Sequence, residues 1–291
     1  MDKLKAPFPY FGGKSRVAAE VWKRFGDPIN YVEPFCGSCA VLLSRPTKPH
    51  TETVNDLDGY LVNFWRALKA DPDGVQKWCD YPVTEIDLHA RHKWLIDQKP
   101  ILEKLKDDPA YYDVKIAGWW VWGISCWFGT GWCKSLSKQT PRLSCSGQGT
   151  HQIGGVDLIG LSKRLRRVRV CCGDWGRVLT PVVTDGSYSL TSVFLDPPYS
   201  EEANCDQKLY ANDSETVAHE VREWALEHGD NPKFRIALCG YEGEHAMPES
   251  WECLEWSASG GYGKDKENRH RERIWFSPHC LTPATQGDLF E

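Results

Sequence analysis

The tetrapeptide Asp196-Pro197-Pro198-Tyr199 is the stretch whose residue types point most directly to chemistry. It follows residues 192–195, an apolar run that predicts a buried strand. The Asp196 carboxylate and the Pro197 carbonyl offer two acceptors on a backbone that two prolines stiffen, and Tyr199 offers a ring for stacking. Two hydrogen-bond acceptors that bind both N–H groups of one amine orient the nitrogen lone pair toward a methyl donor. This arrangement suits methylation of an amine on an aromatic base. An ordinary turn is the alternative, because Asp-Pro-Pro is also typical turn sequence.

A glycine-bearing turn, Glu33-Pro34-Phe35-Cys36-Gly37-Ser38, forms a second candidate site after a predicted strand at residues 29–32. Gly37 lets the backbone approach a ligand closely. Glu33 is placed to meet a positively charged group of a cofactor. The turn therefore predicts one wall of a cofactor pocket.

Two more acids end predicted strands. Asp56 stands where an acid accepts hydrogen bonds from ribose hydroxyls, and Asp174 precedes Trp175, whose indole could stack on an adenine ring. Each acid alone is more typical of a cap or of the surface. Four acids at four strand ends, Glu33 and Asp196 included, favour a nucleotide-type cofactor site.

Predicted strands and helices alternate outside the middle of the chain, as in an α/β protein. The helices are expected at residues 16–25, 57–70 and 214–228, and the strands at 29–32, 51–54, 168–172, 192–195 and 234–239, before a hairpin-like pair at 252–256 and 273–276. The region from about 71 to 160 differs, with helical stretches at 85–96 and 111–127. Its tryptophans predict a helical core, and the turn-rich segment 129–155 predicts a surface loop.

The net charge of −5 does not by itself favour DNA, since phosphate binding depends on local fields. Basic residues do cluster at 163–169 and 269–273, and a solvated surface is the alternative for each of them. The sequence shows no export signal or membrane-length apolar run, so we expect a soluble, cytoplasmic protein with reduced thiols. A redox role for Cys36 and Cys39 is the weakest alternative, and zinc ligation would need residues such as Cys126, Cys133, Cys145 and His151.

Three stretches, taken together, resemble the Dam-like (D12 class, alpha-group) DNA adenine-N6 methyltransferases, particularly those of phages and prophages. They are Pro9-Tyr10-Phe11-Gly12-Gly13-Lys14, the turn at 33–38 and the tetrapeptide at 196–199, in the order that group uses. The resemblance covers about residues 7–70 and 161–276. It implies a Rossmann-like core with a mixed seven-stranded sheet, S-adenosylmethionine as methyl donor, a flipped adenine as acceptor and no metal.

The resemblance also implies roles for individual residues. Tyr10, Lys14, Glu33 and Phe35 would contact the methionine part of the cofactor, with Gly12 and Gly37 in the adjoining turns. Asp56 would hold the ribose, and Asp174 and Trp175 the adenine. Cys39 departs from the family, which commonly has a smaller residue there. Residues 75–155 do not resemble the GATC-recognising members, so no recognition sequence carries over.

The resemblance predicts a discontinuous core at 1–70 and 161–280, a mainly helical target-recognition insertion at 71–160, and a tail at 281–291. Double-stranded DNA is the expected partner. Its phosphates would meet a set of basic residues in the insertion loop, the 163–169 helix and the 269–273 group: Lys134, Lys138, Arg142, Lys163, Arg164, Arg167, Arg269 and Arg271.

The tail contains Gln286-Gly287-Asp288-Leu289-Phe290, which resembles the peptide by which bacterial proteins dock on the replication sliding clamp. Gln286, Leu289 and Phe290 would make that contact, and a frayed terminus is the alternative. Two other functions stay open. A cytosine-N4 methyltransferase needs the same amine chemistry but usually has Ser in place of Asp196, and a catalytically silent DNA-binding homologue would not need an intact tetrapeptide.

Overall fold

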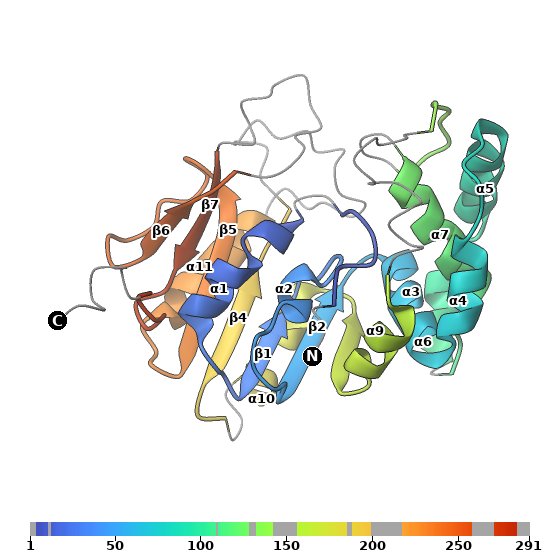
Figure 1. Ribbon diagram of the computed structural model, residues 1–291. Helices are drawn as coiled ribbons and strands as arrows, with labels where there is room; N and C mark the ends of the chain where they lie inside the picture. The colour runs from blue at the N-terminus through green and yellow to red at the C-terminus, as the bar shows by residue number, and fades with distance from the viewer. Residues whose placement is uncertain are drawn as a thin grey trace, which may run out of the picture.

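The computed structural model describes residues 4–10, 13–108, 110–127, 132–141, 156–184, 188–198, 217–257 and 271–283. In this part of the chain, seven strands form one sheet in the order β3-β2-β1-β4-β5-β7-β6 (Figure 1). The strands are β1 (Asn30–Glu33), β2 (Thr51–Asp56), β3 (Val168–Cys172), β4 (Thr191–Leu195), β5 (Phe234–Tyr241), β6 (Glu252–Glu255) and β7 (Glu272–Phe276).

Strands β1 to β5 run parallel, whereas β7 lies antiparallel to both β5 and β6. From β1 the chain proceeds through β2 to β3 on one side of the sheet, and β4 and β5 lie on the other. The strand order thus reverses between β1 and β4, where open α/β sheets bind their ligands beyond the carboxyl ends of the strands. The mixed seven-stranded sheet predicted from the sequence is confirmed.

Helices cover both faces of the sheet, because alternate side chains of each strand point to opposite faces. Tyr31 belongs to the core cluster on the face covered by α1 (Ala18–Phe25), α3 (Gly59–Ala70) and α9 (Leu158–Leu165). Its neighbour Val32 belongs to the cluster on the face covered by α11 (Val217–Gly229). Between β1 and β2 lies the short α2 (Ala40–Leu43), which follows the glycine turn.

Aspartate caps set the beginnings of several helices. Asp58 accepts a hydrogen bond from the Tyr60 amide at the start of α3, and Asp157 accepts one from Gly160 at the start of α9. Such a cap satisfies an amide that has no partner inside the helix and contributes about 1 kcal/mol.

The middle of the chain forms four helices: α4 (Pro72–Cys79), α5 (Glu85–Asp97), α6 (Ile101–Asp107) and α7 (Val114–Cys126). Helices α4, α6 and α7 pack against α3, and α5 packs against α7. Trp120 and Trp122 of α7 are fully buried, so the prediction that the tryptophan-rich helix forms core is confirmed there. The guanidinium of Arg91 lies 4.2 Å from the ring centroids of both Tyr81 and Trp122. Figure 1 shows these helices at the opposite side of the molecule from β6 and β7.

The structure differs from the sequence prediction mainly at element boundaries. The basic helix expected at 163–169 ends at Leu165, and Arg169 instead lies in β3. Lys14–Arg16 forms the 3₁₀ turn η1, and Trp175–Val178 forms η2. The sequence did not predict α4, α6 or the short α10 (Pro181–Thr184). Among the described residues, no helix is long and apolar enough to cross a membrane.

Candidate active site

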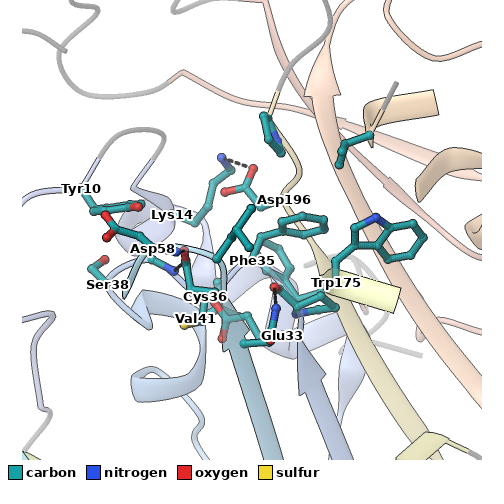
Figure 2. Close-up of a pocket in the computed structure, with 18 of the residues that line it drawn as sticks. Tyr10, Lys14, Glu33, Phe35, Cys36, Ser38, Val41, Asp58, Trp175 and Asp196 are labelled. Carbon is teal, nitrogen blue, oxygen red and sulfur yellow. Dashed lines mark hydrogen bonds and ion pairs between the residues drawn. The ribbon is translucent and has the colours of Figure 1, made fainter. Parts of the chain in front are cut away.

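A cavity of about 260 Å³ opens at the carboxyl ends of the parallel strands (Figure 2). Residues that follow β1, β2, β3 and β4 line it, together with the segment before η1. The sheet therefore brings together residues far apart in sequence, such as Lys14 and Asp196, which are 182 positions apart. These turns include the glycine turn after β1 and the Asp196 loop after β4.

The glycine turn has a shape that requires glycine at position 37. Gly37 has φ +44°, and a Cβ at this position would lie 2.5 Å from Cδ1 of Tyr10. Its amide donates to Oδ2 of Asp56 at 3.0 Å, and its carbonyl accepts from the Trp65 indole at 3.3 Å. The turn is thus tied to β2 and to α3, and it packs against the Tyr10 ring.

Glu33 ends β1 and is 2% exposed. The Tyr31 hydroxyl donates to Glu33 Oε2 at 2.9 Å, and the Leu42 amide donates to it at 3.3 Å. Burial nevertheless raises the pKa of Glu33 to about 8, since desolvation of the carboxylate outweighs these two hydrogen bonds. A cationic ligand group beside Glu33 would supply the missing compensation.

Asp56 and Asn55 organise the next strand end. Asp56 accepts from the amides of Gly37 and Asp58, both at 3.0 Å, and burial raises its pKa to about 7. The Asn55 amide group donates to the carbonyls of Pro34 at 3.0 Å and Gly173 at 2.9 Å. Asn55 Oδ1 is buried and has no hydrogen-bond partner in the described part of the chain. Asn55 thus joins three strand ends and leaves one acceptor in the wall of the cavity.

Two aromatic rings flank the far side of the cavity. The centroids of Phe35 and Trp175 are 6.2 Å apart, with an interplanar angle of 30°. Asp174 is exposed and caps η2, accepting from the Gly176 amide at 2.9 Å. Rings beside an acid at the cavity edge suit a heteroaromatic ring that carries an amine.

Asp196 follows β4 and meets a buried lysine. Lys14 Nζ lies 2.8 Å from Asp196 Oδ1 and 3.9 Å from Glu272 Oε2, and Lys14 is 3% exposed. Burial raises the pKa of Asp196, and the adjacent Lys14 opposes that shift. Pro197 is buried and Pro198 lines the cavity, whereas Tyr199 lies outside the described residues.

Residues 10–112 match the family model of the D12 class N6 adenine-specific DNA methyltransferases. Residues 10–112 thus carry a D12 class N6 adenine-specific DNA methyltransferase domain. The protein is an enzyme that methylates N6 of adenine in DNA with S-adenosylmethionine as donor. The match includes Tyr10, the glycine turn and Asp56, and it ends before Asp196. No curated protein matches the chain significantly.

The structure brings most of the predicted cofactor residues to one cavity. Gly12 lies outside the described residues. Lys14 lines the cavity but forms an ion pair with Asp196, a partner that the sequence did not predict. The other predicted residues that line the cavity are Tyr10, Glu33, Phe35, Gly37, Asp56, Asp174 and Trp175.

The predicted phosphate contacts do not gather at the cavity. Arg164 pairs with the buried Glu52 at 2.6 and 2.8 Å, so its guanidinium is committed to an internal carboxylate. Lys163 and Arg167 are exposed, but they precede β3, whose other end meets the cavity about 16 Å away at 3.3 Å per residue. Arg271 donates to the Glu242 carbonyl at 3.1 Å.

Two lysines of the insertion lie in the segment 132–141. Lys134 acts electrostatically on Asp58, which lines the cavity, and Lys138 is exposed in the same segment. His89 and His92 of α5 contact the backbone of this segment at Gln139 and Ser137. Arg142 and Arg269 lie outside the described residues.

The sequence prediction missed Asn55, Asp58, Cys239 and Glu272. Asn55 and Asp58 flank Asp56, and polar residues at the end of an apolar strand were the available signal. No local sequence pattern marks Cys239 or Glu272, because strand pairing at the other side of the sheet brings Cys239 to Asp196 and Glu272 to Lys14. Cys36 and Cys39 are buried, and burial raises the pKa of both thiols, which opposes a nucleophilic role.

Proposed function

We propose that the acceptor is the N6 amine of an adenine flipped out of double-stranded DNA, received by Asp196 and the Pro197 carbonyl. The observation that carries the proposal is the single cavity shared by Asp196 and the glycine turn. A base inside a duplex cannot reach a recessed strand end, so the adenine must leave the stack. The Asp196 carboxylate accepts from one N6–H and the Pro197 carbonyl from the other. The N6 lone pair then points toward the methyl donor.

The cofactor residues follow from the same cavity. S-adenosylmethionine would supply the methyl group from its sulfonium sulfur, and the methylated N6 would lose one proton to solvent after transfer. Glu33 binds the positively charged end of the cofactor, and Asp56 accepts from the ribose. Phe35 and Trp175 flank its adenine ring, while Asp174 accepts from its amine. The raised pKa of Glu33 and the unpartnered Asn55 Oδ1 support a polar, cationic ligand here.

DNA approaches over the side of the cavity that carries Lys134 and Lys138, and the helical insertion supplies site specificity. Removing one phosphate contact should weaken binding to all DNA sequences. It should also reduce the slope of log K against log salt by about one. We therefore expect Lys138→Ala to weaken DNA binding and lower the slope of log K against log salt. Lys163→Ala, at the opposite end of β3, is the matched control and should leave both unchanged. The reverse pattern would place DNA on the α9 side.

The proposed chemistry is tested with labelled S-adenosylmethionine and unmethylated genomic DNA, followed by nucleoside digestion and mass spectrometry. Wild type should form N6-methyladenine, and Asp196→Ala should abolish it while retaining cofactor binding. Glu227→Ala is the control, because Glu227 is an exposed carboxylate of α11 outside the cavity. N4-methylcytosine as the product would overturn the adenine assignment. A bound cofactor with no methylated base would indicate a silent DNA-binding homologue.

The sliding-clamp contact stays a prediction, because Gln286, Leu289 and Phe290 lie outside the described residues. A labelled peptide of residues 281–291 should bind bacterial clamp in an anisotropy titration. A peptide that does not bind at high micromolar clamp would reject the contact.

A further inference from the structure

The ion pair of Lys14 with Asp196 joins three separate parts of the fold at one buried point. Lys14 comes from η1, Asp196 follows β4, and Glu272 begins β7. Lys14 is 3% exposed and so is Glu272. The ring centroid of Trp256 lies 5.5 Å from Lys14 Nζ and adds an aromatic wall on that side.

Apart from this lysine, the titratable groups described around Asp196 are carboxyl groups and a thiol, which supply no positive charge. Glu272 of β7 interacts electrostatically with Lys14, and Glu33 of β1 interacts electrostatically with Asp196. The Cys239 thiol of β5 forms a hydrogen bond with Asp196. A buried carboxylate loses the solvation of its charged form and takes up a proton unless a cation compensates. Lys14 is the cation that the described residues place against it.

The state of Asp196 decides whether it can receive an amine. An ionised carboxylate is an acceptor at every lone pair, whereas a protonated one must place a hydrogen on one oxygen. Lys14 bonds Oδ1 and fixes the rotation of the carboxylate, so the remaining lone pairs can face the incoming N6–H. Glu272 lies on another side of the ammonium group and limits where Nζ can move.

We propose that Lys14 and Glu272 are positioning residues for methyl transfer, with Lys14 holding Asp196 charged and oriented and Glu272 holding Lys14. This inference rests on the proposed role of Asp196. It replaces the role in cofactor binding that the family resemblance implied for Lys14. Neither residue contacts the reacting atoms, so both act through Asp196.

The test measures two quantities separately on the full-length chain. One is the single-turnover rate of N6-methyladenine formation at saturating cofactor and DNA between pH 5.5 and 9.5. The other is the equilibrium dissociation constant for S-adenosylmethionine. The variants are Lys14→Met, Lys14→Arg and Glu272→Gln. Lys23→Met is the matched control, because Lys23 is 58% exposed on α1.

We expect Lys14→Met to lower the rate about 10²- to 10³-fold at pH 7.5, as for loss of one preorganised electrostatic partner. The acid limb of its pH profile should move up by at least one pH unit, while cofactor affinity changes less than threefold. Lys14→Arg should keep the wild-type acid limb, because it retains the charge. Glu272→Gln should lower the rate several-fold, because Lys14 is held less firmly, and leave the acid limb close to the wild-type position, because the Lys14 charge stays beside Asp196.

Other outcomes overturn the inference. If Lys14→Met weakens cofactor binding more than tenfold and keeps the wild-type pH profile, Lys14 is a cofactor contact. If Lys14→Met fails to fold, the other two variants still test the inference. An acid limb that lies a full pH unit above that of wild type, in Lys14→Arg or in Glu272→Gln, would contradict the assigned roles. If wild type forms N6-methyladenine and Lys14→Met behaves like wild type, the inference is wrong and the proposed function stands. A wild type that methylates no adenine defeats the proposed function and the inference together.

Discussion

Glu33 and Asp196 are two buried carboxyl groups of one cavity, on the adjacent strands β1 and β4, and they have opposite surroundings. Glu33 has a hydroxyl and an amide as partners, and its pKa is raised to about 8. Asp196 has a lysine at 2.8 Å, which opposes the effect of burial on its pKa. In the described part of the chain, Glu33 has no cation among its hydrogen-bond partners, whereas Asp196 has the Lys14 ammonium group.

The difference corresponds to what each group would meet. A cofactor that carries positive charge brings its own counter-ion to Glu33, so a lysine there would compete with it. An adenine amine is neutral and brings no charge, so Asp196 must obtain its compensation from the protein. The distribution of charge in the cavity is therefore complementary to a cationic donor on one side and a neutral acceptor on the other.

The largest expected effects come from neutralising the two carboxyl groups in turn. Asp196→Asn should reduce the rate of the methyl-transfer step about 10²- to 10³-fold, because it removes the charge that acts on the amine. Its affinity for S-adenosylmethionine should change little. Single-turnover kinetics and a direct binding titration measure the two effects separately.

Glu33→Gln should show the converse behaviour. Loss of a charge-assisted contact is worth about 1.5–3 kcal/mol, which corresponds to cofactor binding weakened about 10- to 100-fold. At saturating cofactor the transfer rate should stay within a few-fold of wild type. If both variants lost binding and rate alike, the division of the cavity into two electrostatic halves would be wrong.

Cofactor binding by wild type should strengthen as pH rises to about 8. Glu33 titrates at about 8 and Asp56 at about 7, and both must be ionised to attract a cation or accept from a ribose. Below these values binding must displace a proton, so the affinity falls as pH is lowered. Isothermal titration in two buffers of different ionisation enthalpy measures the proton released. Glu33→Gln should release fewer protons near pH 7.5, and an unchanged number would assign the linkage to another group.

The contribution of Glu33 to the stability of the cofactor-free protein should fall as pH rises, whereas cofactor affinity should increase. A carboxyl group whose folded-state pKa is raised stabilises the fold below its unfolded value of about 4.5, and this contribution is lost as pH rises through 8. Glu33→Gln has no such group to ionise. Urea unfolding should therefore find this variant more stable than wild type by about 1–3 kcal/mol at pH 8 and similar to it near pH 4.5. A variant that is less stable at pH 8 would show that Glu33 already has its compensation inside the fold.

The sequence was sufficient to predict the Glu33 half of the cavity and the general fold. Strand, turn and following acid are local in sequence, so the residues from Glu33 to Asp56 could be predicted from 24 consecutive positions. The surroundings of Asp196 could not be predicted in this way. Lys14 and Glu272 reach it from both ends of the chain through the order of β1, β4, β5 and β7, which no local pattern specifies. For the same reason the pairing of Arg164 with Glu52 was missed.

The smallest expected effect concerns Cys39, which follows the glycine turn with φ +55° and is fully buried. Cys39→Gly would relieve about 1 kcal/mol of left-handed backbone strain. It would also remove a buried thiol from the core and add backbone freedom to the unfolded chain, at a cost of similar size. The free energy of unfolding should therefore change by less than about 1 kcal/mol, and cofactor affinity should stay the same. Urea unfolding that shows a loss above 2 kcal/mol would mean that thiol packing, rather than the Asp56 and Trp65 contacts of Gly37, holds the Glu33 half of the cavity in shape.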